Sequence, residues 1–270
     1  MPKIESSLFE IGVLDQLAFQ DTPLHRIDPR IKLITTLCFI VTVVSYNHYE
    51  FSALLPLILY PIALSASGQL PGAYLWRKLL IASPFALLIG MFNPLFDHST
   101  LLQIGGLSIS GGWVSFASIM LRFTLTVSAA LILVASTGFA TVCMALGRMG
   151  ISKVFTTQLL FLYRYIFILT DEGLRMMRAR NLRSFDKRGT GLKIYGSMLG
   201  QLLLRTMDRA QRIHQAMLCR GFTGDIRLNR QFRLRSTDIT FAAGWLTFFI
   251  LARTCNLPLA VGQFVMGIAA

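Results

Sequence analysis

The chain has few charged residues, and few of these are acidic. Of its 270 residues, 14% are charged and 54% are hydrophobic, and the mean hydropathy is +0.58. An average soluble domain carries about 25% charged residues, so this composition argues against a soluble globular enzyme and against a disordered chain. The 13 acids stand against 26 Lys and Arg, which gives a formal net charge of +13. We therefore predict an integral membrane protein whose basic residues report its topology.

The sequence also lacks the motifs that would give this chain chemistry of its own. It has no phosphate-binding G-x-x-x-x-G-K-[ST] loop, no clear Ser/His/Asp arrangement and no paired carboxylates. The four cysteines form no C-x-x-C pair, and the four histidines are dispersed at His25, His48, His98 and His214. We therefore predict no catalytic residues, no metal site and no cofactor. The first 28 residues have no long apolar run, which argues against a cleaved signal peptide.

Long apolar runs are abundant. A membrane-spanning helix needs about 20 mostly apolar residues, and we predict five spans, at 31–46, 51–67, 79–96, 112–137 and 240–252. The connections 47–50 and 97–111 contain no Lys or Arg, whereas 68–78 and 138–153 contain both. Because basic connections stay in the cytoplasm, we place these two and the N-terminus there. The tail 257–270 is apolar but too short to cross alone.

A further apolar segment, 154–170, is predicted not to cross the membrane. Fifteen of the 26 basic residues lie between Arg175 and Arg235, and a crossing here would put them all outside. Arg164 lies in the middle of the segment, where a charge costs at least about 2.5 kcal/mol at the bilayer centre. We therefore expect an interfacial or bundle-packed helix that continues past Arg178.

The basic region after this segment is predicted to be helical and amphipathic. Glycines at 189–191 and 221–224 mark its breaks. Between them, Arg205, Arg209, Arg212 and Arg220 share one stripe at helical spacing. The opposite stripe is apolar, and it contains Leu203, Met207, Ala210 and Met217.

Charge alone leaves three uses open for this basic region. It could lie on anionic lipid, bind nucleic acid, or dock to a cytoplasmic partner. Nucleic acid is the weakest of these, because the region has few aromatic residues for base contacts. Thirteen of the 15 basic residues are Arg, whose planar fork pairs with carboxylates in defined geometry. That bias favours a protein partner, and lipid remains the alternative.

Two short tripeptides each place one arginine between small residues near a helix end. They are Ala179-Arg180-Asn181 and Cys219-Arg220-Gly221. Small neighbours let a partner's surface approach closely around one long cationic side chain. Taken alone, such tripeptides are weak signals, since any Arg-rich helix contains some.

The order of elements resembles the transmembrane T subunit of energy-coupling factor (ECF) importers, and most closely the CbiQ type of cobalt transporters. The resemblance covers nearly the whole chain. It rests on Asp15-x-Leu17-Ala18 and on the run Thr22-Pro23-Leu24-His25-Arg26-Ile27-Asp28-Pro29-Arg30-Ile31-Lys32-Leu33. It rests also on Tyr163-Arg164-Tyr165 and on Ala216-Met217-x-x-Arg220-Gly221-Phe222.

The resemblance implies an energy-coupling subunit in which two Ala-Arg-Gly-like motifs insert into grooves of two ABC ATPase subunits. Carried over, Arg180 and Arg220 are the docking arginines, flanked by Ala179, Asn181, Cys219 and Gly221. The chain departs from the pattern at Asn181, where Gly is common, and at Cys219, where Ala is common. ATP hydrolysis would then belong to the partner ATPases, and substrate capture to a CbiM-like membrane subunit, which a small accessory subunit can accompany.

We thus expect an all-α integral membrane protein with about five transmembrane helices and a cytoplasmic coupling block of long amphipathic helices. The expected parts are a cytoplasmic N-terminal segment (1–30), four transmembrane helices (31–137), coupling helices (138–237) and a C-terminal span with an apolar tail (238–270). The expected function is energy coupling in a cobalt importer of the plasma or inner membrane. Nickel or a vitamin as substrate, or a membrane enzyme or lipid-binding protein with a basic interfacial domain, are the alternatives.

Overall fold

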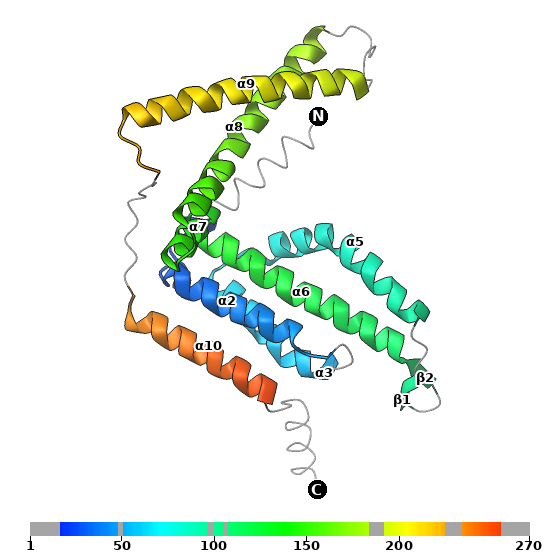
Figure 1. Cartoon of the computed structure of the whole chain (residues 1–270). Coiled ribbons are helices and arrows are strands. Elements are labelled where there is room, and N and C mark those ends of the chain that lie inside the picture. Colours follow the sequence, from blue (N-terminus) through cyan, green and yellow to red (C-terminus); the bar gives the residue numbers. More distant parts are fainter. Residues whose placement is uncertain are drawn as a thin grey trace. The chain divides into compact units, whose positions relative to one another are not determined.

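The computed structural model describes residues 17–47, 51–96, 100–104, 107–183, 192–224 and 234–254 (Figure 1). The chain divides into two compact units. The bundle unit comprises residues 13–142 and 231–270, and the long-helix unit comprises residues 1–12 and 143–230. The predicted break at 189–191 and the tail 257–270 lie outside the described residues.

The bundle unit is almost entirely helical. Its elements are α2 (Pro29–Val44), α3 (Phe51–Leu54), η1 (Leu55–Ile58), α4 (Leu59–Ser67), α5 (Gly72–Phe96), β1 (Thr100–Ile104), β2 (Leu107–Ser110), α6 (Gly111–Thr137) and α10 (Ser236–Thr254). Each predicted span coincides with helix, although 51–67 is divided by a 3-10 turn at Pro56. Helix α5 begins seven residues earlier than predicted. The antiparallel hairpin β1–β2 lies in a stretch predicted as a loop.

Two of the described helices are long and apolar enough to cross a membrane by length and composition. They are Gly72–Pro94 within α5 and Gly111–Thr137, which is α6. The segments Phe51–Ser67 and Phe139–Arg148 are apolar but shorter. The membrane character predicted from composition therefore has a structural basis in α5 and α6, whereas the count of five spans stays a prediction.

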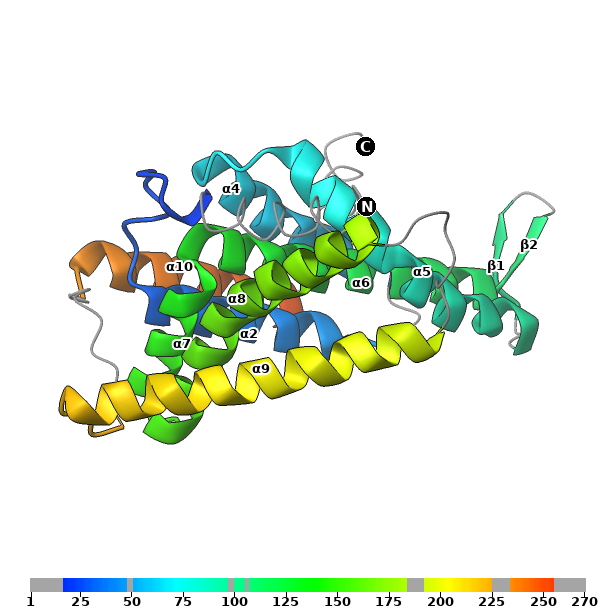
Figure 2. The ribbon, with the colours of Figure 1, turned by 90° about the horizontal axis from the view of Figure 1, so that it is seen from above.

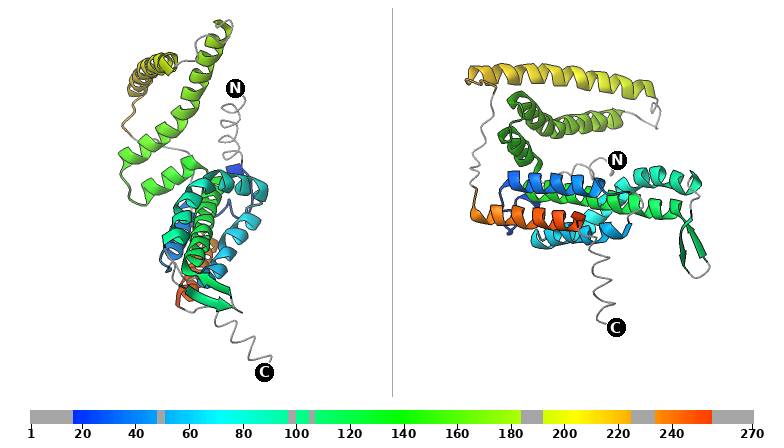
Figure 3. Two further views of the ribbon diagram at one scale, coloured as in Figure 1. Left: turned by 90° about the vertical axis from the view of Figure 1, so that its right-hand side faces the viewer. Right: turned by 60° about the horizontal axis from the view of Figure 1, so that its bottom comes forward.

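An aromatic cluster forms the centre of the bundle unit. Tyr60 is fully buried, and its ring lies 4.4 Å from that of Phe39, 4.8 Å from Trp245 and 5.3 Å from Phe249, measured between centroids. Its hydroxyl is bonded to the hydroxyl of Thr36 at 3.0 Å. Because α10 supplies Trp245 and Phe249, the last helix is part of the same core as α2 and α4 (Figure 3).

Both ends of α2 are capped by charged side chains. Asp28 is the N-cap residue, and its carboxylate accepts from the Arg30 N–H at 2.9 Å, with Pro29 in the first turn. Beyond the C-terminus, Arg253 of α10 donates to the Ser45 carbonyl at 3.1 Å, and Arg122 of α6 donates to the Asn47 carbonyl. Cations are favourable at a helix C-terminus, so Arg122 has a structural role inside an apolar helix.

Helices α5 and α6 are closely packed through a small residue. A Cβ atom at Gly90 would lie 2.9 Å from the Phe116 ring, which no real side chain allows without movement. One helical turn further, the Asn93 amide donates to the Ser115 hydroxyl at 2.8 Å. Small residues and interhelical hydrogen bonds are how helices associate within lipid, so this pair fits a membrane environment.

The described part of the long-helix unit is mainly helical. Helix α7 (Phe139–Arg148) begins in the bundle unit and ends in the long-helix unit, which also contains α8 (Lys153–Arg183) and α9 (Leu192–Cys219). The sequence predicted only a connection at 138–153, so α7 was missed. The prediction that 154–170 continues past Arg178 as one helix is confirmed by α8 (Figure 2).

Candidate functional site

Helices α8 and α9 run in opposite directions and contact one another near their middles. A Cβ atom at Gly173 of α8 would lie 3.8 Å from the Leu202 side chain, so the small residue faces α9 directly. Beside it, the Arg205 guanidinium donates to the Glu172 carboxylate at 2.9 Å. These side chains are 60% and 23% exposed, so the pair is worth at most about 1 kcal/mol. It links α9 to α8 beside the contact between Gly173 and Leu202.

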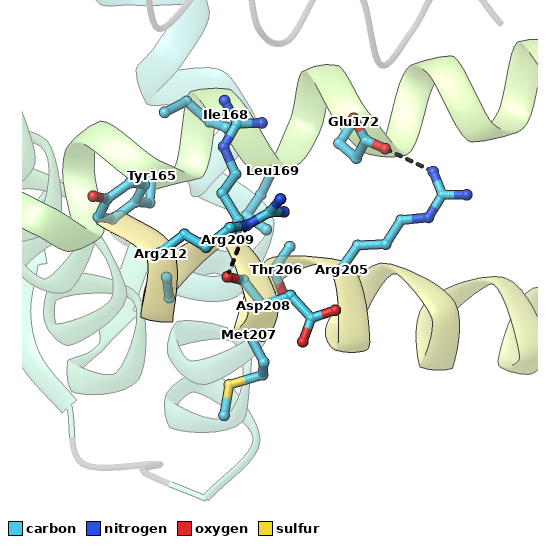
Figure 4. Close-up of a pocket in the computed structure, with 11 residues that line it drawn as sticks. Tyr165, Ile168, Leu169, Glu172, Arg205, Thr206, Met207, Asp208, Arg209 and Arg212 are labelled. Atoms are coloured by element: carbon cyan, nitrogen blue, oxygen red, sulfur yellow. Dashed lines mark hydrogen bonds and ion pairs between the residues drawn. The ribbon is translucent and has the colours of Figure 1, made fainter. Parts of the chain in front are cut away.

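A pocket of about 390 Å³ lies between α8 and α9 beside this ion pair (Figure 4). Helix α8 contributes an apolar wall that contains Tyr165, Ile168 and Leu169. Helix α9 contributes three arginines of the predicted cationic stripe, which are Arg205, Arg209 and Arg212. The cationic stripe therefore flanks the contact with α8 and does not lie on the far side of α9.

The predicted apolar stripe of α9 is largely exposed. Leu203 and Met207 are 63% and 56% exposed, so they do not form the internal packing face. In the described part of α9 the half-buried residues are Met198, Leu202, Thr206, Ile213 and Met217, and of these only Met217 belongs to the predicted apolar stripe. The sequence pattern could not separate an apolar face that packs within this chain from one that stays exposed.

Arg180 lies near the end of α8 and is half-buried. Its guanidinium carbon lies 5.0 Å from the centroid of the Tyr195 ring, at the start of α9. A guanidinium over an aromatic face at this distance makes a cation–π contact. Its neighbours Ala179 and Asn181 are exposed. The first tripeptide is therefore held in place by α9, with its small residues on the surface.

Arg220 directly follows the last residue of α9 and is exposed, as is Cys219 before it. Gly221 has φ +78°, in the left-handed region that favours glycine. The Gly221 N–H donates to the Leu218 carbonyl at 2.9 Å, and the next N–H, of Phe222, donates to the Met217 carbonyl at 3.0 Å. This is the Schellman motif that ends a helix. It presents Arg220 at a sharply ended helix terminus.

The end of α9 is also fixed against α8. The Phe222 ring lies 6.3 Å from the Phe161 ring, and the Thr157 hydroxyl donates to the Gly224 carbonyl at 3.1 Å. Phe222 belongs to the same short motif as Arg220 and Gly221. The motif therefore has a built-in anchor as well as an exposed arginine.

The two tripeptides lie at opposite ends of α9 and form two separate sites. Arg180 contacts Tyr195, and the helix from there to Cys219 spans roughly 36 Å at 1.5 Å per residue. A single small ligand cannot reach both arginines. The arrangement suits two partner surfaces, or one large one.

Comparison with known proteins identifies the family of this chain. The model of the CbiQ family, described as cobalt transport protein, matches residues 20–232. That range includes α2 to α9 with both arginine motifs. The chain belongs to the CbiQ family.

Individual relatives of this CbiQ-family chain agree with that membership. It is 28% identical over 167 residues to the cobalt transport protein CbiQ of Salmonella typhimurium, which covers 57% of this chain and 74% of the relative. It is 26% identical over 215 residues to the energy-coupling factor transporter transmembrane protein EcfT of Bacillus subtilis, with 74% and 80% covered. It is 29% identical over 231 residues to an uncharacterised protein of Methanocaldococcus jannaschii, with 81% and 77% covered. The chain is thus a membrane component of an ECF-type transporter.

The histidines of this CbiQ-family chain do not assemble a metal site in the part that the structure describes. The ring nitrogens of buried His25 contact the Thr22 hydroxyl at 2.6 Å and the Leu17 carbonyl at 2.9 Å. His214 is exposed on α9, and His48 and His98 lie outside the described residues. Among the described residues, no three His, Cys, Asp or Glu side chains are grouped so that they could hold a metal ion.

Several residues that support the site were missed from the sequence. Tyr195 holds Arg180, and Phe161 holds the end of α9 through Phe222. A signal existed for Phe222, because it follows the glycine that ends α9 and a hydrophobic residue at that position often packs back on the structure. No signal in the sequence connects Tyr195 with Arg180, since that contact depends on how α8 and α9 cross.

Proposed function

We propose that this chain is the energy-coupling transmembrane subunit of an ECF-type importer for cobalt. Arg180 and Arg220 would each dock to one cytoplasmic ABC ATPase subunit, and the rest of the chain would contact a CbiM-like substrate-capture membrane subunit. ATP hydrolysis would be performed by the ATPases, because the sequence has no phosphate-binding loop. The chain itself would be a non-catalytic lever of the plasma or inner membrane, with its N-terminus and long helices in the cytoplasm.

The observation that carries this proposal is the antiparallel pair α8–α9 with one arginine motif at each end of α9. Each motif pairs one long cation with small exposed neighbours, and their separation of roughly 36 Å matches two docking points better than one. Charge-assisted bonds between Arg and carboxylates are strong and geometrically specific. Two acidic grooves on two ATPase subunits would therefore fix the orientation of the pair.

Cobalt as the substrate rests on the family description and on the Salmonella relative. The residues that select the substrate would lie on the substrate-capture subunit. Whether the complex transports cobalt, nickel or a vitamin is therefore decided by an uptake measurement. The test is uptake of labelled Co²⁺, Ni²⁺ and vitamins by vesicles that contain the full complex. Uptake of Co²⁺ alone supports the proposal, and uptake of another substrate without Co²⁺ contradicts the cobalt assignment.

The docking role is tested by co-purification with ATPase subunits in mild detergent. We expect Arg220→Ala to lower recovered ATPase at least tenfold, since loss of one interfacial charge partner costs about 2–5 kcal/mol. Arg209→Ala is the matched control, because Arg209 is also an exposed arginine of α9, and it should retain the ATPase. Stoichiometric ATPase with Arg220→Ala contradicts this docking site. Absence of ATPase from the parent chain contradicts the coupling function.

The native cysteines offer an independent test. Cys219 is exposed beside Arg220, whereas burial raises the pKa of the Cys143 thiol to about 11. A thiol with that pKa is protonated at pH 7.5 and reacts slowly. In a variant without Cys38 and Cys255, alkylation should reach Cys219 alone, and bound ATPase should block it. Unchanged alkylation of Cys219 in the complex would exclude the motif from the interface.

A further inference from the structure

One carboxylate in the bundle unit joins the starts of two helices that are far apart in sequence. Asp238 of α10 is 1% exposed. One of its oxygens accepts from the backbone N–H of Asp28 at 3.3 Å, and the other accepts from the backbone N–H of Arg235 at 2.9 Å. Burial of a carboxylate is unfavourable unless it is hydrogen-bonded, and here both oxygens have a donor.

The two donor N–H groups belong to the residues at the same position, the N-cap, of their two helices. Arg235 directly precedes α10, and Asp28 is the N-cap residue of α2. In a capping box, an acidic side chain at the third helical position bonds to the N–H of its own N-cap residue, and Asp238 does this for α10. Helix α2 has Ile31 at its third position, which has no acceptor. Asp238 therefore completes the capping box of α2 from another helix.

Helix dipoles add to this arrangement. An N-terminus carries partial positive charge, so an anion there is stabilised. Helices α2 and α10 run in the same direction side by side (Figures 1 and 3). The carboxylate of Asp238 therefore lies at the positive ends of both helices at once.

The same part of the bundle unit also contacts the end of α6, from which the chain continues towards the long helices. The Lys32 ammonium, which is buried, donates to the Ser136 carbonyl at the end of α6 at 3.2 Å. At Gly138, which follows α6 with φ +78°, a Cβ atom would lie 3.2 Å from the Cβ of Ala18. We call residues 17–32 the entry segment. It contacts the chain where it leaves the bundle unit after α6 and where it returns before α10.

We propose that Asp238 is a positioning residue for energy coupling, which ties the start of α10 to the entry segment so that both connections to the long helices share one frame. The proposal rests on the proposed function, because it assigns to this frame the transmission of movement from α8 and α9 into the bundle unit. Without Asp238, the start of α10 would be free to move independently of the entry segment. ATP hydrolysis would then continue without driving transport.

The first test is hydrogen exchange at the Asp28 and Arg235 amides in the purified full-length chain. Asp238→Asn keeps the size of the side chain but has one accepting oxygen, and its amide nitrogen opposes a second N–H. One of the two amides must lose its acceptor, so we expect exchange there to become at least tenfold faster. Asp21→Asn, which removes an exposed carboxylate of the entry segment, should leave both amides unchanged. Unchanged exchange in Asp238→Asn overturns the shared cap.

The second test uses the complete complex in vesicles and measures Co²⁺ taken up per ATP hydrolysed. For Asp238→Asn we expect this ratio to fall at least fivefold while ATPase recovery stays at the parent level. A change in exchange with an unchanged ratio overturns the positioning role. If Asp238→Asn does not fold, Asp238→Glu replaces it. Its longer side chain keeps the bond to Arg235 and displaces the bond to Asp28, so only the Asp28 amide should exchange faster.

The two tests distinguish a failure of this proposal from a failure of the proposed function. If the parent chain recruits no ATPase, the proposed function fails, and with it the coupling role of Asp238. The exchange measurement still decides whether Asp238 caps both helices, because it uses the chain alone. A loss of ATPase recovery in Asp238→Asn itself would assign Asp238 to assembly and would also overturn the proposal.

Discussion

The two units of this chain use their charged residues in opposite ways. In the bundle unit, four charged side chains are bonded to backbone groups at helix ends, and these are Asp238, Lys32, Arg122 and Arg253. In the long-helix unit, the arginines lie beside the α8–α9 contact or on the surface, and Arg220 is exposed at a helix terminus. Charges that satisfy internal backbone groups hold one unit together, whereas charges that point outward remain available to a partner.

The units differ as much in their packing. The bundle unit has a core around Tyr60 and Phe39. In contrast, Thr156 is the only buried residue among those that the structure describes in α8 and α9. Two helices with so little buried surface are expected to gain their rigidity from what they bind. The long-helix unit therefore resembles one side of a protein–protein interface, whereas the bundle unit is a folded domain with its own core.

The largest expected effect tests the scaffold directly. Tyr60→Ala removes a fully buried ring with three aromatic neighbours, and we expect it to lower the free energy of unfolding by about 3 kcal/mol. Leu203→Ala removes an apolar side chain that is 63% exposed on α9, and should change the stability of the isolated chain by less than about 0.5 kcal/mol. Thermal unfolding in detergent measures both. Equal losses would show that α9 has an internal core after all.

An intermediate effect concerns the turn that presents Arg220. Gly221→Ala places a Cβ atom at φ +78°, which costs about 1 kcal/mol, and should loosen the end of α9. Gly196→Ala is the matched control, because Gly196 is within α9 and has open space around its Cβ position. This second change should stabilise the helix by about 0.5–1 kcal/mol. Unfolding should therefore move to lower temperature in Gly221→Ala and to higher temperature in Gly196→Ala. ATPase recovery should fall in Gly221→Ala and stay at the parent level in Gly196→Ala. A gain of stability in both variants would contradict the assigned turn.

Much of the bundle could be predicted from sequence, because local signals and hydropathy act on the same residues. The apolar run 31–46 predicted α2 to within two residues at each end, and the run 112–137 predicted α6 to within one residue. The prediction that 154–170 continues past Arg178 as one helix is met by α8, whereas the prediction from charge counting that it does not cross the membrane stays a prediction. These features depend on neighbours in sequence, which is why the pattern was sufficient.

Other features depend on residues that meet only in three dimensions. Asp238 and Asp28 are bonded across 210 positions, and nothing local marks Asp238 as the cap of α2. The apolar stripe of α9 was predicted from its helical spacing, but the spacing did not tell that Leu203 and Met207 are exposed. Hydropathy records that a face is apolar and not which surface covers it. The candidate site was therefore predicted at Arg180 and Arg220, and their supports Tyr195 and Phe161 were not.

The smallest expected effects come from one ion pair in each unit. In the bundle unit, the hydrogen bond and charge of exposed Arg26 lower the pKa of the Asp21 carboxyl below its usual 3.8. A lowered carboxyl pKa adds stability above the unfolded-state value, and this is lost as the pH falls through the folded-state value. Because both side chains are exposed, solvent and salt screen the pair. Asp21→Asn should therefore give the same unfolding curve as the parent at pH 7 and 0.15 M salt.

The pair in the long-helix unit should matter more, because Glu172 is only 23% exposed and joins α8 to α9. We expect Glu172→Gln to destabilise the α8–α9 contact by about 0.5 kcal/mol at pH 7. Faster hydrogen exchange along α9 would report it, with Asp21→Asn as the control. Because the long-helix unit buries so little surface, even a weak ion pair should contribute measurably to its stability. The bundle unit should lose its own exposed pair without effect. If Asp21→Asn were the more damaging change, the two units would share one mode of stabilisation and the contrast between them would fail.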